Sequence, residues 1–251
     1  MTTPAQPGLR DLSSVQLIAV SASTRDDIVR DLSADPARVH VVPEGIAPPI
    51  APTPPATAAV AAWGIRSPYL LFVSQWRPHK RIEDLVEAFE QLAPKHPKLQ
   101  LVLAGKPNPL FPAVIDRVEH SPARHRIITP GFVPDETLPA LYANAELFVF
   151  PSLYEGFGFP PLEAMSLGTP VLAANATCLP EMLGDAAEFF EAGNVGELTS
   201  AIEALLANPK RRAELAKLGK VQAAQYTWEK VAKATLELYQ QVLSAPTLPE
   251  S

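Results

Sequence analysis

The sequence has 251 residues, of which 47% are hydrophobic, and a formal net charge of −6. This length and apolar content support one large domain or two smaller ones, and the negative charge argues against broad electrostatic binding of nucleic acid. A single cysteine, Cys178, excludes an internal disulfide framework and a multi-cysteine zinc site. A lone cysteine also fits a reducing compartment, so we expect a cytoplasmic protein.

No basic start followed by a long apolar run is visible, and no stretch approaches the length of a bilayer span, so we expect neither an export signal nor a membrane span. The segment KRRAELAKLGK, residues 210–220, could lie on an anionic membrane surface, although a charged helix face is more often only solvated. Peripheral contact with the inner face of the membrane therefore stays open.

Residues 1–46 contain one strand-helix-strand pattern, formed by VQLIAVS, STRDDIVRDL and RVHVVP. Such a unit cannot bury both faces of its strands alone, so it must pack on the rest of the chain or on something absent. Six of the 28 prolines fall between residues 43 and 55. Because consecutive prolines favour extended, semi-rigid backbone, residues 47–62 are predicted to be a linker.

From residue 63 onward, short apolar runs alternate with segments of helical periodicity. The runs are YLLFVS (69–74), LQLVLAG (99–105), RIITPG (126–131), LFVFPS (147–152) and PVLAAN (170–175). Continuous apolar runs are typical of strands buried on both faces, and their alternation with helices predicts an α/β fold with a doubly wound parallel sheet. A mostly helical segment is predicted from about residue 194 to 243.

Ligands of such sheets bind at the carboxyl ends of the strands, and the first of these ends is followed by SQWRPHKRIEDL. Its cationic side chains are Arg77, His79, Lys80 and Arg81. A helix is predicted to begin near Arg81, and cations at the electropositive end of a helix are unfavourable unless an anion binds nearby. The pattern therefore indicates a phosphate site, or else a solvated loop whose cations pair with Glu83 or Asp84.

Gly105 and Lys106 follow the second strand, where a glycine permits close approach of a ligand but serves any tight turn equally well. The stretch SLYEGFGFPPLEAMSLGTPVL, residues 152–172, follows the fourth. Its glycines allow unusual dihedral angles, its double proline suits the first turn of a short helix over about 161–167, and Gly168 suits the end of that helix.

Two glutamates in this stretch, Glu155 and Glu163, are candidate ligand-binding residues. Glu163 is favoured by the helix dipole whether or not it binds a ligand, whereas Glu155 contributes nothing obvious to the fold. The pair could be the acid and base of a hydrolase, or could accept hydrogen bonds from sugar or ribose hydroxyls. The sequence contains neither phosphate-binding glycine motif, no D-x-D run, and only poorly spaced histidines at positions 120 and 125, so no metal site is expected.

Taken in order, four segments closely resemble the donor-binding half of retaining GT-B glycosyltransferases of family 4, over about residues 65–243. They are FVSQWRPHKRIEDLVEAF, LVLAGK, GFVPDETLPALYANAELFVFPSLYEGFGFPPLEAMSLGTPVLAAN and LPEMLGDAA. The resemblance rests on the E-x7-E element, the upstream Arg and Lys pair and the G-F-V turn. Residues 15–46, ending in VVPEGI, resemble the last piece of the family's N-terminal acceptor domain, most of which is missing from this sequence.

The resemblance implies that a nucleoside diphosphate sugar lies in the crevice and that neither a metal nor another cofactor is needed. Arg77 and Lys80 would hold the diphosphate and stabilise the leaving group. Glu155 would bind the transferred sugar and Glu163 the ribose hydroxyls. The other implied contacts are backbone groups of Gly156, Phe157, Gly158 and Phe159 to sugar and phosphate, the backbone of Val133 to the base, and Gly105 and Lys106 beside the nucleotide.

The implied reaction is transfer of a hexosyl group, with retention, to a glycan or lipid-linked saccharide acceptor. The segments look most like those of bacterial mannosyltransferases, which favours GDP-mannose slightly over UDP-glucose. Without a full acceptor domain we do not expect efficient transfer by these residues alone. They could be an excised domain, a truncated product, one subunit of a split enzyme or a non-catalytic binding module, and a sugar-nucleotide epimerase is a less favoured alternative.

Overall fold

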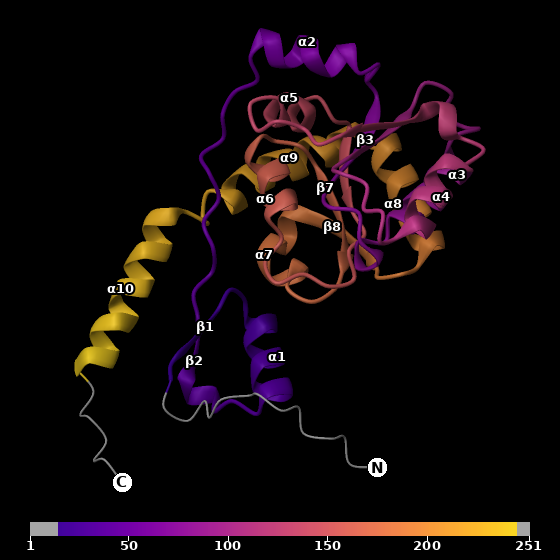
Figure 1. The fold of residues 1–251 in the computed structure, drawn as a ribbon. Helices are drawn as coiled ribbons and strands as arrows, with labels where there is room; N and C mark the ends of the chain where they lie inside the picture. The colour runs from indigo at the N-terminus through magenta and orange to yellow at the C-terminus, as the bar shows by residue number, and fades with distance from the viewer. Residues whose placement is uncertain (1–14, 245–251) are drawn as a thin grey trace, which may run out of the picture. The chain divides into compact units, whose positions relative to one another are not determined.

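A computed structural model describes residues 15–244, which divide into two compact units (Figure 1). One unit combines the chain up to Gly45 with the segment from Tyr226, and the other runs from Ile46 to Gln225. The elements of the first unit are β1 (Leu17–Ala19), α1 (Ala22–Leu32), the short 3-10 helix η1 (Pro36–Arg38), β2 (Val39–Val41) and α10 (Trp228–Ser244). Strands β1 and β2 pair in parallel, which confirms the predicted strand-helix-strand pattern.

The first unit has a small core in which α1 packs on the two strands. Ala19, Ala34 and Val39 are buried there, and partly buried aliphatic residues surround them. Helix α10 belongs to this unit, although residues 63–251 were expected to form one domain. The backbone at Gly45 packs closely on the start of α10, since a Cβ atom at that position would lie only 2.6 Å from the backbone nitrogen of Trp228. The assignment of residues 1–46 to an acceptor domain stays a prediction.

The second unit is built on a six-stranded sheet with the order β5-β4-β3-β6-β7-β8, in which all neighbours are parallel. The strands are β3 (Tyr69–Val73), β4 (Gln100–Ala104), β5 (Ile127–Gly131), β6 (Leu147–Phe150), β7 (Val171–Asn175) and β8 (Ala187–Glu191). The predicted doubly wound parallel sheet is confirmed. Its central strands are buried on both faces, as their continuous apolar runs require.

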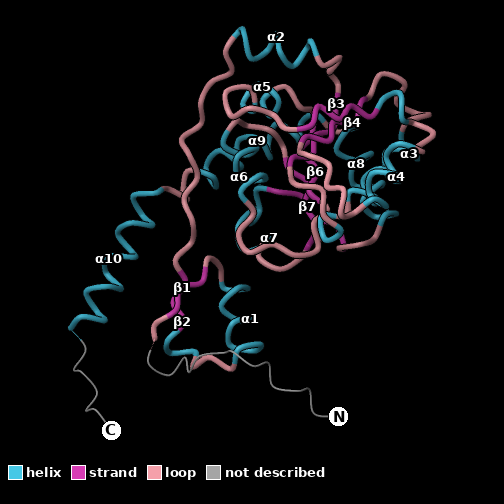
Figure 2. Tube along the Cα trace, in the orientation of Figure 1, coloured by secondary structure: helices cyan, strands magenta, loops and turns pink. Residues whose placement is uncertain are grey.

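Helices cover both faces of this sheet (Figures 1 and 2). The helices are α2 (Pro54–Ala62), α3 (Ile82–Leu92), α4 (Pro112–Glu119), α5 (Leu138–Ala143), α6 (Phe159–Ser166), α7 (Leu179–Leu183), α8 (Val195–Ala207) and α9 (Pro209–Ala223), with short 3-10 turns η2 (Pro78–Lys80), η3 (Arg124–Arg126) and η4 (Gly184–Ala186). Helices α3, α4 and α8 pack together on one face, and α5, α6, α7 and α9 pack on the other. The predicted helical segment after residue 194 is confirmed as α8, α9 and α10.

The structure corrects one local prediction and adds one strand. The expected linker 47–62 ends earlier, because α2 begins at Pro54, after the Thr53 side chain accepts a hydrogen bond from the Ala56 backbone. Proline is compatible with the first helical turn, where no backbone N–H donor is needed, so a proline run does not exclude a helix start. Strand β8 was not predicted, because this edge strand has only a short apolar run and carries Glu188 within it.

The basic segment 210–220 lies in α9, and its two arginines are occupied within the second unit. Arg211 pairs with Glu188 at 2.6 Å and with Glu214 at 2.8 Å. Arg212 pairs with Glu146 and also donates to carbonyl oxygens at the end of α8. These contacts weaken the case for a membrane-binding face. Within residues 15–244, none of the helices combines the length and apolar character needed to cross a bilayer.

Candidate functional site

The strand order places a topological switch point between β3 and β6. After β3 the chain continues through α3 to β4 and β5 on one side, and after β6 it continues through α6 to β7 and β8 on the other. The loops at the carboxyl ends of β3 and β6 therefore turn away to opposite faces of the sheet and leave a crevice between them. This is the position at which open α/β sheets bind their ligands.

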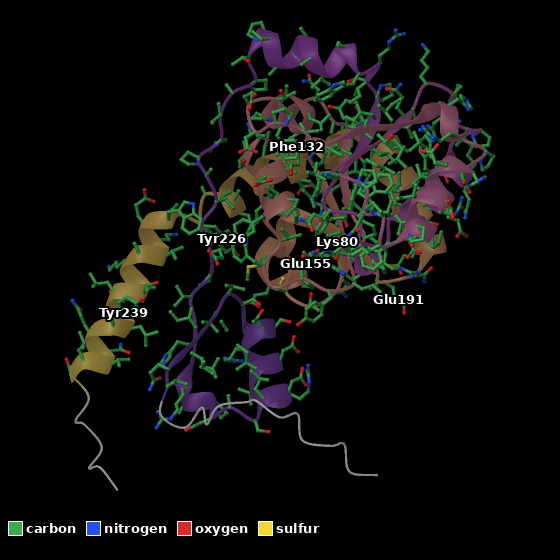
Figure 3. The ribbon with its side chains drawn as sticks, viewed as in Figure 1. Lys80, Phe132, Glu155, Glu191, Tyr226 and Tyr239 are labelled. Atoms are coloured by element: carbon green, nitrogen blue, oxygen red, sulfur yellow. The ribbon has the colours of Figure 1, made fainter. Side chains whose placement is uncertain are left out.

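Lys80 and Glu155 meet at this crevice (Figure 3). Lys80 ends the η2 turn after β3, and Glu155 lies in the loop after β6. The Lys80 Nζ and Glu155 Oε1 atoms are 2.5 Å apart, and the two side chains are only 12% and 13% exposed. Nζ also lies 5.3 Å from the ring centroid of Phe150, the last residue of β6. Two residues 75 positions apart in the sequence thus form one partly buried ion pair.

Hydrogen bonds tie the two loops to each other. The carbonyl oxygen of His79 accepts from the Leu153 backbone at 2.8 Å and from the Ser152 hydroxyl at 3.3 Å. The Glu155 backbone N–H donates to the Thr177 hydroxyl at 3.0 Å. Thr177, just beyond β7, has a φ of +46°, which is strained for a β-branched residue. Both ends of the ion pair are therefore held in place by neighbouring loops.

The field around η2 is positive. The pKa of His79 lies below its usual value, first because the ring is partly buried and then because Lys80 and Arg77 are close, while Glu155 acts in the opposite direction. A neutral imidazole is expected at pH 7. Arg77 is exposed, and its guanidinium makes no hydrogen bond or ion pair with any residue in the described range 15–244. It can therefore reach a ligand without breaking an internal contact.

Arg81 does not join this group of cations. It precedes α3 in a left-handed conformation with a φ of +52°, and its guanidinium binds the Asp84 carboxylate at 2.7 and 2.8 Å. This is the arrangement predicted for a solvated loop whose cations pair with nearby carboxylates. The basic side chains of the segment therefore have separate partners, since Lys80 pairs with Glu155 and Arg81 pairs with Asp84 of its own helix.

Gly105 and Lys106 follow β4 at the same edge of the sheet. Gly105 has a φ of +127°, and a Cβ atom there would lie 1.8 Å from the Ser74 carbonyl oxygen. Its N–H donates to the Gly131 carbonyl at 2.8 Å. Close packing of three strand ends thus explains this glycine without a ligand. Lys106 is exposed, Val133 is buried just after β5, and contacts of these three positions with a nucleotide stay predictions.

The glycine loop between β6 and α6 has the backbone that its sequence predicts. Gly158 precedes α6 with a φ of +100°, and a Cβ atom there would lie 3.1 Å from Leu179 of α7. Phe157 is buried, while Phe159 is exposed and packs against it edge-on, with ring centroids 4.9 Å apart. Gly156 lies between Glu155 and this aromatic pair. Helix α6 ends at Ser166, and Gly168 has a φ of +81° just beyond it, as expected.

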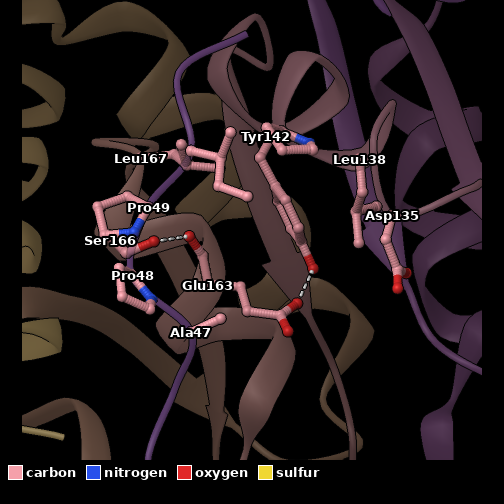
Figure 4. A pocket seen from close by; sticks show the side chains of 11 residues that line it. Ala47, Pro48, Pro49, Asp135, Leu138, Tyr142, Glu163, Ser166 and Leu167 are labelled. Atoms are coloured by element: carbon pink, nitrogen blue, oxygen red, sulfur yellow. Dashed lines mark hydrogen bonds between the residues drawn. The ribbon is translucent and has the colours of Figure 1, made fainter. Parts of the chain in front are cut away.

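Glu163 lies on α6 in a cavity of about 360 Å³ (Figure 4). Its Oε2 atom accepts a hydrogen bond from the Tyr142 hydroxyl at 2.9 Å. Burial raises the pKa of Glu163, the bond from Tyr142 opposes that rise, and the charge of Asp135 adds to it. The cavity is lined by Ala47, Pro48, Pro49, Ile50, Asp135, Leu138, Pro139, Tyr142, Glu163, Ser166 and Leu167. Glu155 and Glu163 therefore have different surroundings, one beside a cation and one beside a phenol.

Three residues of the site were not predicted from the sequence, namely Tyr142, Asp135 and Thr177. A buried tyrosine usually needs a hydrogen-bond partner, which is the one general signal that pointed to Tyr142. Its partner lies 21 positions away, and the Thr177 contact joins positions 22 apart. Contacts at this separation depend on how α5, α6 and the loop after β7 pack, so periodicity could not identify them.

Comparison with known proteins identifies a protein family for most of the chain. Residues 59–222 match the family model described as glycosyl transferases group 1. The O-antigen chain mannosyltransferase B of Escherichia coli is 38% identical over 173 residues, covering 68% of this chain and 45% of that protein. The MMP alpha-(1->4)-mannosyltransferase of Mycolicibacterium hassiacum is 31% identical over 234 residues, covering 91% and 54%. The chain thus spans about half the length of these two relatives.

Among solved structures, the sucrose-phosphate synthase of Thermosynechococcus elongatus superimposes with a TM-score of 0.77 at 26% identity. The alignment covers 90% of this chain and 58% of that protein. The parallel sheet with its switch point agrees with the Rossmann-like domain of GT-B folds. The family model covers well over half of the sequence, and the match to the Mycolicibacterium hassiacum mannosyltransferase covers 91% of it. The chain belongs to the group 1 glycosyl transferase family.

Proposed function

We propose that this chain binds a nucleoside diphosphate sugar and acts in the transfer of its hexosyl group, of mannose or glucose type, to a glycan or lipid-linked saccharide. The observation that carries the proposal is the Lys80–Glu155 pair at the switch point of the sheet. A phosphate can replace the carboxylate beside Lys80, and the released carboxylate can then accept hydrogen bonds from sugar hydroxyls. One cation and one acceptor at a single position suit the junction between a diphosphate and a sugar.

In this proposal Lys80 and Arg77 bind the diphosphate and stabilise the negative charge of the leaving group, the part that a metal ion plays elsewhere. Glu155 binds the transferred sugar, and Glu163 binds the ribose. Backbone groups of Gly156 through Phe159 contact the sugar and phosphate, Val133 contacts the base, and Gly105 and Lys106 flank the nucleotide. The anomeric configuration is retained, and the leaving phosphate helps to deprotonate the acceptor.

Guanine is the base that we propose. Asp135 lies in the same cavity as Glu163, so a base joined to a ribose at Glu163 can approach a second carboxylate. Guanine presents two adjacent N–H donors on one edge, whereas uracil has a single N–H between two carbonyl oxygens. A carboxylate therefore discriminates in favour of guanine. The relatives named as mannosyltransferases support mannose as the sugar of this donor.

Calorimetric titration with GDP-mannose, GDP, UDP-glucose and UDP tests these roles separately. Glu155→Ala should weaken GDP-mannose binding relative to GDP binding about tenfold or more, because only the sugar reaches Glu155, while the diphosphate of GDP no longer has to displace a carboxylate from Lys80. Lys80→Ala should weaken both GDP ligands, and Asp135→Asn should reduce the preference for GDP over UDP. The matched control is Lys98→Ala, because Lys98 is exposed and lies just before β4, at the amino-terminal ends of the strands. Unchanged affinities in the Lys80 and Glu155 variants would refute the site.

A second candidate function is a donor-binding module that transfers sugar only together with an acceptor-binding partner. The small first unit favours this reading, because its sheet has only two strands within the described residues, and the matched relatives are about twice as long. Transfer from radiolabelled GDP-mannose to a saccharide acceptor, measured with this chain alone, separates the two candidates. Turnover by the chain alone would exclude the module. A cytoplasmic location stays a prediction.

A further inference from the structure

We infer that Tyr142 is a positioning residue for the donor nucleotide, because its hydroxyl holds one oxygen of Glu163 and directs the other toward the ribose hydroxyls. This inference rests on the ribose-binding role proposed for Glu163. It assigns a function to a side chain that does not itself need to touch the donor.

The Tyr142 side chain is firmly held. It is only 1% exposed, and its ring packs against Phe148 of β6 at a tilt of 55°, with centroids 5.5 Å apart. Its carbonyl oxygen accepts a hydrogen bond from the Thr169 hydroxyl at 2.8 Å, which ties the end of α5 to the segment before β7. This packing fixes the position of the phenol oxygen, and the hydroxyl donates a hydrogen bond to Oε2 of Glu163 at 2.9 Å.

The opposite oxygen of Glu163 remains available to a ligand. Within the part of the chain that the structure describes, Oε1 has no hydrogen-bond partner. Apart from Glu163, Asp135, Tyr142 and Ser166, the residues that line the cavity are apolar. A carboxylate fixed through one oxygen in such a cavity can present the second as an acceptor to a pair of vicinal hydroxyls.

The Tyr142 hydrogen bond also affects the protonation state of Glu163. Burial and the charge of Asp135 raise the pKa of Glu163 and so favour the neutral acid, a poorer acceptor, whereas the Tyr142 hydrogen bond favours the carboxylate. Asp135, before α5, and Tyr142, on α5, are the titratable side chains that line the cavity with Glu163, and the wall formed by residues 47–50 carries none. Loss of the phenol should therefore leave Glu163 both less fixed and more readily protonated.

The test compares Tyr142→Phe with Ser121→Ala in the full chain. Ser121 is also buried, and its hydroxyl donates to a carboxylate oxygen of Glu90 on α3 at 2.6 Å, so its variant loses a similar hydrogen bond away from α5 and Glu163. The readout is the affinity for GDP divided by the affinity for 2′,3′-dideoxy-GDP, which isolates the ribose hydroxyls. Tyr142→Phe should lower this ratio about three- to tenfold, and Ser121→Ala should leave it unchanged. Above about pH 4.5, the usual pKa of a glutamate, the GDP affinity of Tyr142→Phe should also rise more with increasing pH than that of the wild type.

A merely structural role is separated by repeating Tyr142→Phe in a Glu163→Gln background, where the substitution should cause no further loss. If Tyr142→Phe does not fold, Thr169→Val keeps the phenol but loosens it, and should lower the ratio in the same direction by a smaller factor. A wild-type ratio in the Tyr142 or Thr169 variant, while Glu163→Gln loses it, would overturn the inference and leave the proposed function intact. A wild-type ratio in Glu163→Gln would remove the ribose role, and the inference with it.

Discussion

Removal of Lys80 is the substitution that tests the central pair most directly. Lys80→Met keeps most of the aliphatic side chain but leaves the Glu155 carboxylate without its cation at a position where it is only 13% exposed. A buried charge that loses its partner retains its desolvation cost and no longer has the attraction that compensated for it. The variant should therefore be less stable than the wild type, even though the residue is proposed to serve binding.

The magnitude follows from the distance and the burial. At 2.5 Å and an effective dielectric constant of about 20, the attraction between the two charges is about 6 to 7 kcal/mol. Desolvation offsets much of it, and breaking a fully buried pair typically costs about 3 to 5 kcal/mol. Because the pair borders an open crevice, we expect Lys80→Met to cost about 2 to 4 kcal/mol. The double variant Lys80→Met/Glu155→Gln should recover at least about 1 kcal/mol of that loss.

Urea unfolding followed by far-ultraviolet circular dichroism measures both quantities on the wild type, the two single variants and the double variant. Lys95→Met is the matched control, because its pair with Glu203 has the same form but is 62% and 41% exposed, and its loss should leave the unfolding midpoint nearly unchanged. Effects of the two site substitutions that add to within about 0.5 kcal/mol would show that the charges are not coupled and would refute this reasoning.

Three further predictions concern the surroundings of the site. Gly105→Ala should destabilise the second unit by at least about 3 kcal/mol in the same unfolding assay, because its Cβ would overlap the Ser74 carbonyl, and a wild-type midpoint would contradict this. Burial acts to raise the pKa of Glu90, but the hydrogen bonds from Arg117 and Ser121 and the charge of Arg117 together outweigh it and the pKa lies below its usual value, so this stabilisation is present above about pH 4.5 and is lost as pH falls through the lowered pKa. Arg117→Met should flatten that acid dependence in unfolding curves recorded at several pH values. Thr177→Gly should keep or slightly raise the melting temperature by relieving the left-handed strain, while it weakens GDP-mannose binding; unchanged binding would show that the hydroxyl is dispensable.

Much of the site could be predicted because it depends on strand order and local chemistry. Continuous apolar runs separated by helical segments predict a parallel sheet, and such a sheet places the loops after its strands at one edge. Lys80 and Glu155 each follow one of these strands, so both were expected near the crevice. Arg81 shows where this reasoning stops, because its position left open a cation at a phosphate site or a cation paired with Glu83 or Asp84, and only the structure shows the pair with Asp84.

The amino-acid sequence by itself determined the parallel sheet, the glycine and proline geometry around α6, and the identity of the two glutamates as candidates, because these depend on periodicity and on backbone preferences of single residues. Only the tertiary structure decided what each glutamate touches. The ion pair of Glu155 with Lys80 and the hydrogen bond of Glu163 with Tyr142 join residues 75 and 21 positions apart. Their partners were set by the packing of α5 and α6 and by the divergence of the chain after β3 and β6, which no local pattern encodes.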